Sequence, residues 1–350
     1  MSNSRQGTLR LVAVAAAALF VAGCGLDDDS GAGGSSEGGS VSGSITISGS
    51  STVEPISAAV AQKFSSQNPD VQISVDGPGT GDGFELFCRG DTDVSDASRP
   101  IDPEEEIPAC KENGVEFIEL RVAIDGIAVL TSPENDAVGC LSFPDLYALL
   151  GPESRDFDRW SDANELGRQV GGSGDYPDAR LEITAPGEES GTYDSFEELV
   201  LEGIAVDVRK QPEDGSFVRP DYQASADDNV IIQGISGSEG SLGWVGFAFF
   251  VNNEDAVKAL AIEEEEGTGC VEPTEETIAS TEYPIARNLY IYVNAERAET
   301  SRAVQAYVDH YLSEEGIQSV SEVGYVSLES NALEETRSVW EAKETGSREG

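Results

Sequence analysis

Residues 45–64 read ITISGSSTVEPISAAVAQKF and combine three patterns in succession. The run Ile45–Ser48 predicts a short β-strand, and the apolar residues Ile56, Val60 and Phe64 recur every four positions, as they do on one face of a helix. Between them lies a short joint of glycine and hydroxyl residues. A strand that passes through such a joint directly into a helix is typical of α/β proteins.

The same order of strand, glycine- or hydroxyl-rich joint and helix recurs along the chain. The predicted strands Val71–Val75, Thr92–Ser95 and Leu181–Thr184 each end in such a joint. The amphipathic run Tyr193–Leu201 follows the last of them. Further strands are predicted at Val115–Leu120, Ile124–Ser132, Leu242–Val251 and Leu289–Val293, and further helices at Ser301–Leu312 and Asn331–Lys343. This alternation predicts an α/β fold with largely parallel strand pairing.

Four joints share a chemistry that suits a small oxyanion. They are Ser50-Ser51-Thr52, Gly79-Thr80-Gly81, Ser98-Arg99 and Ser190-Gly191-Thr192. A helix N-terminus has unpaired N–H groups and a partial positive charge, hydroxyls add donors, and glycine lets the backbone approach a ligand. We expect the joints to meet at the carboxyl ends of the strands, with Arg99 as the cation. Taken singly, Ser51 or Ser190 is more simply interpreted as an N-cap. For Arg99, the alternative to a ligand contact is a surface or interlobe salt bridge.

The N-terminus has the features of an export signal. Two arginines precede the apolar run Leu11–Gly23, which is too short to span a bilayer as a helix. The end of the run, Val21–Cys24, resembles the lipobox of bacterial lipoproteins, in which the cysteine becomes the lipidated first residue. We therefore expect a signal peptide at 1–23, a lipid on Cys24 and a flexible glycine- and serine-rich tether at 24–43. The alternative is an ordinary signal peptide with a chance cysteine.

The charge balance is strongly acidic. The 350 residues carry 66 acidic and 21 basic side chains, a net charge of −45, which argues against non-specific binding of nucleic acid. A hydrophobic content of 39% and this length favour two folded domains. His310 is the only histidine, so we expect no catalytic triad, metal site or cofactor. Acidity spread along the chain suits solubility in concentrated salt and suggests a salt-loving source.

The cysteines predict disulfides. Apart from Cys24, the chain contains Cys88, Cys110, Cys140 and Cys270, without a CxxC motif. An even number in an exported chain predicts two bonds. Of the three possible pairings we favour Cys88 with Cys110 and Cys140 with Cys270, because each bond then closes within one predicted domain.

Four motifs carry a family resemblance. In order they are ISGSSTVEPIS, GTGDGFELFC with DVSDASRPI, EESGTYDSF and GSLGWVGFAFF, and together they resemble the periplasmic phosphate-binding proteins of the PstS family over about residues 45–345. The resemblance implies a two-lobed, type II periplasmic-binding α/β fold, a Venus flytrap with two crossovers between its lobes. We expect the crossovers near Asp125–Leu130 and Tyr283–Leu289. The expected parts are lobe 1 at 44–126 plus 286–343, lobe 2 at 127–285, and a tail at 344–350.

The resemblance also implies the ligand contacts. In lobe 1 they are Ser51, Thr52, the Val53 amide and Thr80, and in lobe 2 they are Ser190, Gly191 and Thr192. The joints themselves add Gly81, Ser98 and Arg99 to the expected contacts.

Two positions depart from the best-known family pattern. Many members carry an aspartate, the acceptor of the proton of hydrogen phosphate, in the loop that here reads Ser98-Arg99-Pro100, and an arginine where this chain has Pro186. The chain therefore resembles a subgroup with an SRP loop, in which Arg99 supplies the cation. Asp82, Asp96 and Asp125 are candidates for the proton acceptor.

The implied function is extracytoplasmic binding of inorganic phosphate and its delivery to the permease and ATPase subunits of an ABC importer. The protein would be lipid-anchored on the outer face of the cytoplasmic membrane, in a periplasm or at a cell surface. One alternative is a carrier of another tetrahedral oxyanion such as sulfate. An extracellular phosphate-ester hydrolase is disfavoured because no metal cluster or histidine base is visible. A third alternative is an adhesive or signalling lipoprotein without a ligand.

Overall fold

The computed structural model describes residues 41–188, 190–212 and 215–348. The predicted signal peptide, Cys24 and all but the last three residues of the predicted tether lie outside these ranges. Within the described ranges, no helix combines the length and apolar character needed to cross a membrane. The first strand begins at Gly43.

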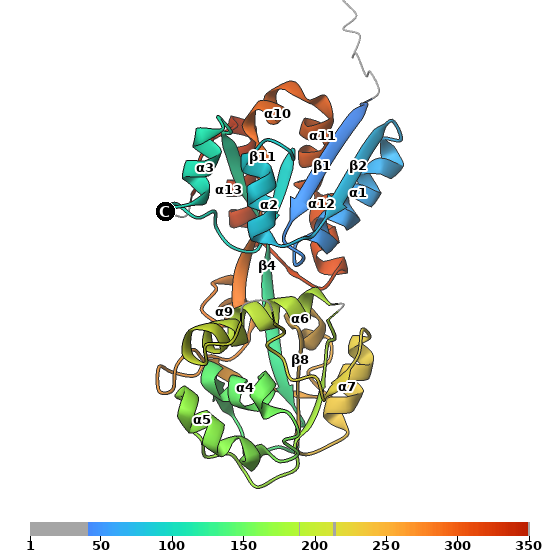
Figure 1. Cartoon of the computed structure of the whole chain (residues 1–350). Helices are drawn as coiled ribbons and strands as arrows, with labels where there is room; N and C mark the ends of the chain where they lie inside the picture. The colour runs from blue at the N-terminus through green and yellow to red at the C-terminus, as the bar shows by residue number, and fades with distance from the viewer. Residues whose placement is uncertain (1–40, 189, 213–214, 349–350) are drawn as a thin grey trace, which may run out of the picture. The chain divides into compact units, whose positions relative to one another are not determined.

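Two lobes with separate hydrophobic cores make up the described residues (Figure 1). The first lobe contains β1 (Gly43–Gly49), β2 (Val71–Asp76), β3 (Val94–Ala97), the start of β4 (Phe117–Thr131), β11 (Ala286–Asn294), β12 (Val326–Ser327), α1 (Glu54–Gln67), α2 (Thr80–Cys88), α3 (Glu106–Glu112), α10 (Ala295–Thr300), α11 (Arg302–Tyr311), α12 (Glu314–Glu322) and α13 (Ser330–Ala342). Its strands lie in the order β2-β1-β3-β11-β4.

The second lobe begins with the rest of β4. It also contains β5 (Cys140–Ser142), β6 (Glu182–Ala185), β7 (Gln223–Ala224), β8 (Ser241–Gly246), β9 (Lys258–Ala259), β10 (Ala261–Glu263), α4 (Phe143–Leu150), α5 (Asn164–Val170), α6 (Gly191–Phe196), α7 (Asp228–Ser236), α8 (Phe247–Val251) and α9 (Glu275–Ala279), with π-helical turns at Glu197–Leu201 and Ile204–Val208 and 3-10 turns at Pro152–Ser154 and Trp160–Ala163. Its strands lie in the order β4-β8-β6-β7.

The opening strand and helix form as predicted. Ile56, Val60 and Phe64 are all buried on one face of α1, where they pack into the core of the first lobe. The isoleucines of β1, Ile45 and Ile47, lie in the same core. Spacing along the sequence therefore determines which face of this helix turns inward.

Strand β4 corrects the prediction of two separate strands at 115–120 and 124–132. It is a single strand of 15 residues, and Arg121 is the one position in it that is not fully buried. Up to Gly126 it pairs with β11, and from Ile127 to Leu130 it pairs with β8. The strand runs from one lobe into the other in Figure 1, and it continues through Gly126, the residue after which the partner strand changes. The expected lobe boundaries stay predictions.

Two further predictions differ from the structure: the largely parallel strand pairing and the strand at 242–251. Pairing is parallel between β1 and its neighbours β2 and β3, and between β6 and β8, but it is antiparallel along β4 and β11. The reason is that β11 brings the chain back to the first lobe beside the strand on which it left. The aromatic run predicted as a strand at 242–251 divides at Gly246, after which Phe247–Val251 forms α8.

Both favoured disulfides are present. Cys88 bonds to Cys110 within the first lobe, and Cys140 bonds to Cys270 within the second. The first bond ties α2 to α3 and lies in a small aromatic cluster with Phe84 and Phe87.

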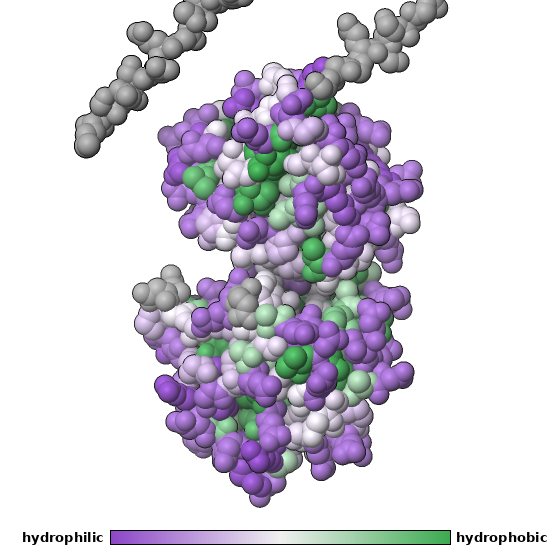
Figure 2. Space-filling view, turned by 90° about the vertical axis from the view of Figure 1, so that its right-hand side faces the viewer, coloured by the Kyte–Doolittle hydropathy of each residue, from purple (hydrophilic) through white to green (hydrophobic). Residues whose placement is uncertain are grey.

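The acidity is a surface property. Among the described residues, the buried carboxylates are Asp96, Glu119, Asp125, Asp145 and Glu263. Figure 2 shows hydrophilic residues over both lobes on the face that it presents, with the surface hollowed between them. Exposed carboxylates are therefore the main source of the charge excess.

The end of β1 packs tightly against β3. Gly49 has a φ of +155°, and a Cβ atom built on it would lie 2.0 Å from the carbonyl oxygen of Asp96. The next residue, Ser50, donates its backbone N–H to that same oxygen at 2.8 Å. Only glycine allows this approach, which sets the direction in which the first joint leaves the sheet.

Asp96 is a fully buried carboxylate behind that joint. Its Oδ1 accepts a hydrogen bond from Ser57 Oγ of α1 at 2.8 Å. Burial raises the pKa of Asp96 to about 7, and the nearby carboxylates of Glu54 and Asp76 add to the shift. The folded protein therefore holds a proton at Asp96 over a pH range in which the unfolded chain has lost it.

We predict that Gly49→Ala destabilises the first lobe by about 2–4 kcal/mol, because the methyl group collides with the backbone of β3. Gly203→Ala is the matched control, since Gly203 has a helical φ of −57° and open space around its Cα. The control should be neutral or slightly stabilising. Urea unfolding followed by tryptophan fluorescence measures both, and equal stabilities of the two variants would contradict the prediction.

We predict that Asp96→Asn removes a pH dependence of stability. Because the folded pKa of about 7 lies above the ordinary 3.8, the contribution of Asp96 is fully present below pH 3.8 and is lost as the pH rises through 7. Relative to wild type, the variant should gain about 2–3 kcal/mol between pH 5 and pH 8.5. Chemical unfolding at the two pH values tests this, and a stability difference that does not change with pH would contradict it.

Candidate functional site

The four joints lie at the carboxyl ends of β1, β2, β3 and β6. The first leads into α1, the second begins α2 at Thr80, and the fourth begins α6 at Gly191. The third, Ser98-Arg99, continues into a loop before α3. The strand-to-helix order expected from the sequence therefore holds for three joints out of four.

The three joints of the first lobe touch one another. Thr80 Oγ1 lies 3.0 Å from Ser98 Oγ and also accepts a hydrogen bond from the Ser98 backbone N–H. Gly79 N–H donates to the carbonyl oxygen of Gly49 at 2.9 Å, which brings the second joint against the first. Hydroxyl groups from separate parts of the chain are thus gathered at one edge of the sheet.

The fourth joint reaches the first across the lobe boundary. Ser51 Oγ donates to Asp194 Oδ2 at 2.9 Å, and Thr52 Oγ1 lies 3.0 Å from Ser195 Oγ. A Cβ atom on Gly191 would lie 3.5 Å from the carbonyl oxygen of Ser51, so the two backbones approach closely. The structure therefore brings the first joint against the start of α6, where the fourth joint lies.

Several of the predicted donors have local partners in this structure. Val53 N–H donates to the carbonyl oxygen of Ser50, and Ser190 Oγ accepts from Thr192 N–H as an N-cap. Thr52 is buried, as are Thr80 and Ser98. Local hydrogen bonds and burial therefore fix the positions of these groups without a ligand.

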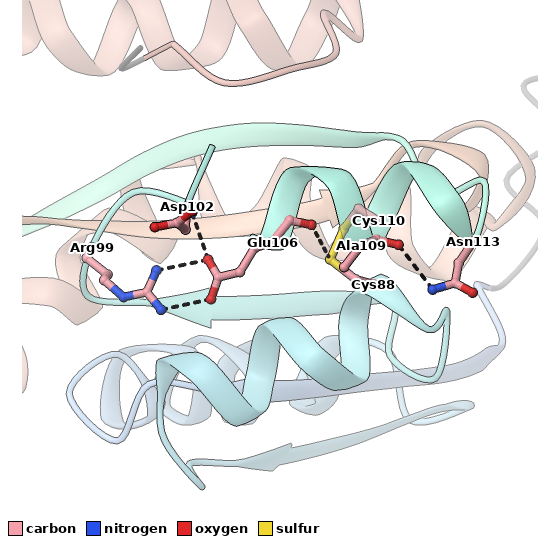
Figure 3. The surroundings of a disulfide bond; sticks show 7 residues. All are labelled: Cys88, Arg99, Asp102, Glu106, Ala109, Cys110 and Asn113. Atoms are coloured by element: carbon pink, nitrogen blue, oxygen red, sulfur yellow. Dashed lines mark hydrogen bonds and ion pairs between the residues drawn. A yellow bond between two sulfur atoms is a disulfide. The ribbon is translucent and has the colours of Figure 1, made fainter. Parts of the chain in front are cut away.

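Arg99 points along its own lobe. Its Nη1 and Nη2 donate to the two carboxylate oxygens of Glu106 at 2.9 and 2.8 Å (Figure 3). Nη1 also donates to the carbonyl oxygen of Pro100. The guanidinium carbon lies 5.5 Å from the ring centre of Phe84. The hydrogen bonds to Glu106 raise the pKa of Arg99 further. This is the salt-bridge interpretation that the sequence left open.

Glu106 is itself held in place from two directions. One of its carboxylate oxygens accepts from Asp102 N–H at 2.7 Å. Its carbonyl oxygen lies 3.5 Å from Sγ of Cys88, next to the bond to Cys110 (Figure 3). The disulfide thus supports the helix that orients Arg99.

A second arginine, which the sequence did not single out, lies at the meeting point of the lobes. Arg287 of β11 contacts Thr52 Oγ1 at 3.3 Å and Ser195 Oγ at 3.2 Å, and it forms ion pairs with Asp125 and Glu198. Its side chain is 10% exposed. The signal that could have revealed it is a charged residue within the predicted return crossover at 283–289.

A groove of about 450 Å³ connects the two arginines. It is lined by Ser98, Arg99 and Pro100 of the first lobe, by Glu198, Leu199 and Thr281 of the second, and by Ala286, Arg287, Asn288 and Tyr290.

The candidate proton acceptors fall in different surroundings. Asp82 is exposed on α2, and Asp96 lies behind the first joint. Asp125 faces Arg287, and its pKa is raised mainly by burial. A further carboxylate, Asp194, accepts the hydroxyl hydrogen of Ser51, and burial raises its pKa as well. Asp125 and Asp194 therefore lie closest to the donors that meet across the lobes.

Potential metal ligands gather once in the described part of the chain, at Cys140, Glu263 and Cys270. The disulfide occupies both sulfur atoms there, so this group does not offer a thiolate site.

Comparison with known proteins agrees with this architecture. A family model described as the PBP superfamily domain matches residues 34–315. Protein SphX of Synechocystis is 36% identical over 291 residues, which cover 83% of this chain and 80% of that protein. The phosphate-binding protein PstS of Staphylococcus saprophyticus is 30% identical over 312 residues, which cover 89% of this chain and 87% of that protein.

A solved structure shows the same fold. The crystal structure of a possible phosphate binding protein from Planctomyces limnophilus is 34% identical, with a TM-score of 0.77, and the match covers 87% of this chain and 99% of that one. From the joints, the two lobes and these relatives together, it follows that this chain belongs to the PBP superfamily and, within it, to the PstS family.

Proposed function

We propose that this protein binds inorganic phosphate between its lobes and delivers it to an ABC importer. The observation that carries the proposal is the meeting of hydroxyl-rich strand ends from both lobes, seen in the contacts of Ser51 with Asp194 and of Thr52 with Ser195. Phosphate as the ligand is supported by two relatives that match this chain over most of their length. One is named a phosphate-binding protein, and the other a possible phosphate binding protein.

The proposed contacts come from neutral donors and one arginine. They are Ser51, Thr52, the Val53 amide, Thr80, Gly81, Ser98, Arg99, Ser190, Gly191 and Thr192. Hydroxyl and amide donors suit an oxyanion because each adds a directed hydrogen bond at the positive end of a helix dipole. Arg99 has five N–H donors, and its contacts with Glu106 and Pro100 use three of them, so two are left for a ligand.

Lobe motion would control access to this site. Thr52, Thr80 and Ser98 are buried in this structure, so phosphate would enter a more open form and be enclosed as the lobes close. Because the closed form uses donors from both lobes, phosphate would shift the population towards it. An importer would then distinguish loaded from empty protein by shape.

The predicted lipid on Cys24 would keep the protein at the outer face of the membrane, within reach of the importer. This part of the proposal rests on the sequence of the N-terminus, which lies outside the described residues.

We predict that the purified protein binds phosphate more tightly than sulfate and that Arg99→Ala weakens phosphate binding by about 10- to 100-fold, the range expected for losing charge-assisted hydrogen bonds. Calorimetric titration with both anions at several pH values measures the two effects. Tighter binding of sulfate would instead identify a carrier of another oxyanion.

Arg89→Ala is the matched control for this experiment. Arg89 is also an arginine of the first lobe, but it is exposed and pairs with Glu85 and Asp91 on the surface. Its removal should leave phosphate affinity unchanged. Unchanged affinity in Arg99→Ala as well would remove Arg99 from the proposed site.

A further inference from the structure

Arg287 lies where the chain returns from the second lobe to the first. It pairs in register with Asp125 of β4, next to the pair of Ala286 with Gly126. One residue later in β4, at Ile127, β8 replaces β11 as the partner strand. The backbone of Arg287 therefore lies beside the crossing between the lobes, about which the two lobes can move.

One guanidinium contacts both lobes at once. Nη2 lies 3.3 Å from Thr52 Oγ1 in the first joint and 3.2 Å from Ser195 Oγ in α6. Nη1 lies 2.7 Å from a carboxylate oxygen of Glu198, and Nε lies 3.6 Å from Oδ2 of Asp125. Thr52 and Asp125 belong to the first lobe, whereas Ser195 and Glu198 belong to the second.

The direction of the hydrogen bonds at this cluster follows from the chemistry of the groups. A guanidinium can only donate, so Arg287 uses oxygen lone pairs of Thr52 and Ser195 and leaves their hydroxyl hydrogens available. Ser195 Oγ lies 3.0 Å from Thr52 Oγ1, and either hydroxyl can be the donor in that pair. When Thr52 is the donor, its hydroxyl hydrogen points to Ser195 Oγ. From there it can turn to an oxyanion at the first joint.

The buried contacts of Arg287 with Thr52 and Ser195 contribute more to stability than its exposed ion pair with Glu198. Glu198 is 43% exposed, so its ion pair with Arg287 is screened by solvent and contributes little by itself. The hydroxyls of Thr52 and Ser195 are buried beside a guanidinium that has left water, and there the loss of a partner is costly. Separation of the lobes would take Ser195 and Glu198 away from Arg287 but would leave Thr52 and Asp125 beside it.

We propose that Arg287 is a positioning residue for phosphate binding, which holds Thr52 as a hydrogen-bond donor and stabilises the closed arrangement through Ser195 and Glu198. The first half of this inference rests on the proposed function, because it concerns a phosphate donor. The second half concerns the lobes alone and applies with or without a ligand. Arg287 acts through Thr52 and through the lobes, so it needs no direct contact with phosphate.

The test compares wild type, Arg287→Gln and a control variant, Arg219→Gln. Arg219 is also a buried arginine, with a side chain 3% exposed that pairs with Asp221 in the second lobe. Each protein is titrated with inorganic phosphate, its dissociation rate is measured by stopped flow, its Tm is recorded, and its radius of gyration without phosphate is measured by X-ray scattering.

We expect Arg287→Gln to weaken phosphate binding by about 10- to 100-fold, mainly through faster dissociation, and to increase the radius of gyration of the ligand-free protein. Arg219→Gln should lower the Tm while it leaves phosphate affinity within about twofold of wild type, because the hydrogen-bond partners of its side chain, Leu149, Phe157 and Asp221, lie outside the joints. Equal losses of affinity in the two variants would show that Arg287 has only a structural role, as would unchanged affinity and radius in Arg287→Gln.

Two further outcomes have defined meanings. If wild type does not bind phosphate, the proposed function fails, and the radius of gyration of Arg287→Gln alone decides whether Arg287 stabilises closure. If Arg287→Gln does not fold, Ser195→Ala removes the second-lobe end of the same contact. That variant should bind phosphate more weakly by several-fold, and unchanged affinity would overturn the proposal.

Discussion

Strand β4 enters the second lobe with its backbone hydrogen bonds unbroken, because β8 takes the place of β11 beyond Gly126. A buried strand cannot leave its N–H and C=O groups unpaired, so the exchange of partners allows the chain to cross between lobes without a solvated linker. The return strand β11 runs antiparallel beside it. The connection is thus a pair of hydrogen-bonded strands, which favours hinge motion about the crossing point.

The position of this crossing determines which side chains of the two lobes can contact each other. The strand ends of the first lobe carry three joints, and α6 of the second lobe brings the fourth to Ser51 and Thr52. Arg287 and Asp125 face each other in register at the crossing itself. A buried cation and a buried carboxylate are therefore held at a point that both lobes share, although neither is part of a joint.

The local interactions at the joints, and not the net charge of the chain, would decide whether an anion binds there. A net charge of −45 opposes an anionic ligand at long range, but fields from exposed carboxylates fade over about 8–10 Å at ordinary ionic strength. Near the joints, Arg99 is paired with Glu106, and Arg287 with Asp125 and Glu198. These pairs fix the direction of each guanidinium, so binding of an oxyanion would depend mainly on neutral donors at contact distance.

Local patterns predicted the elements well where one interaction dominates. Spacing placed the buried face of α1, and glycine and hydroxyl residues marked the joints, because these features depend on neighbours in the chain. Prediction failed where a distant partner decides the outcome. The segment around Arg121 reads as a gap between two strands, yet β11 pairs with the residues on both sides of it, across a register shift, and makes one strand. The aromatic run after Gly246 becomes α8 although its composition favours a strand.

The sequence by itself determined the export signal pattern, the family resemblance, the strand-to-helix joints and, within an even set of cysteines, the favoured disulfides. Tertiary structure alone decided that Arg287 joins Thr52 to Ser195. The physical reason is distance along the chain. A joint is made by consecutive residues, whereas the partners of Arg287 lie 235 and 92 positions away and meet only when both lobes are folded.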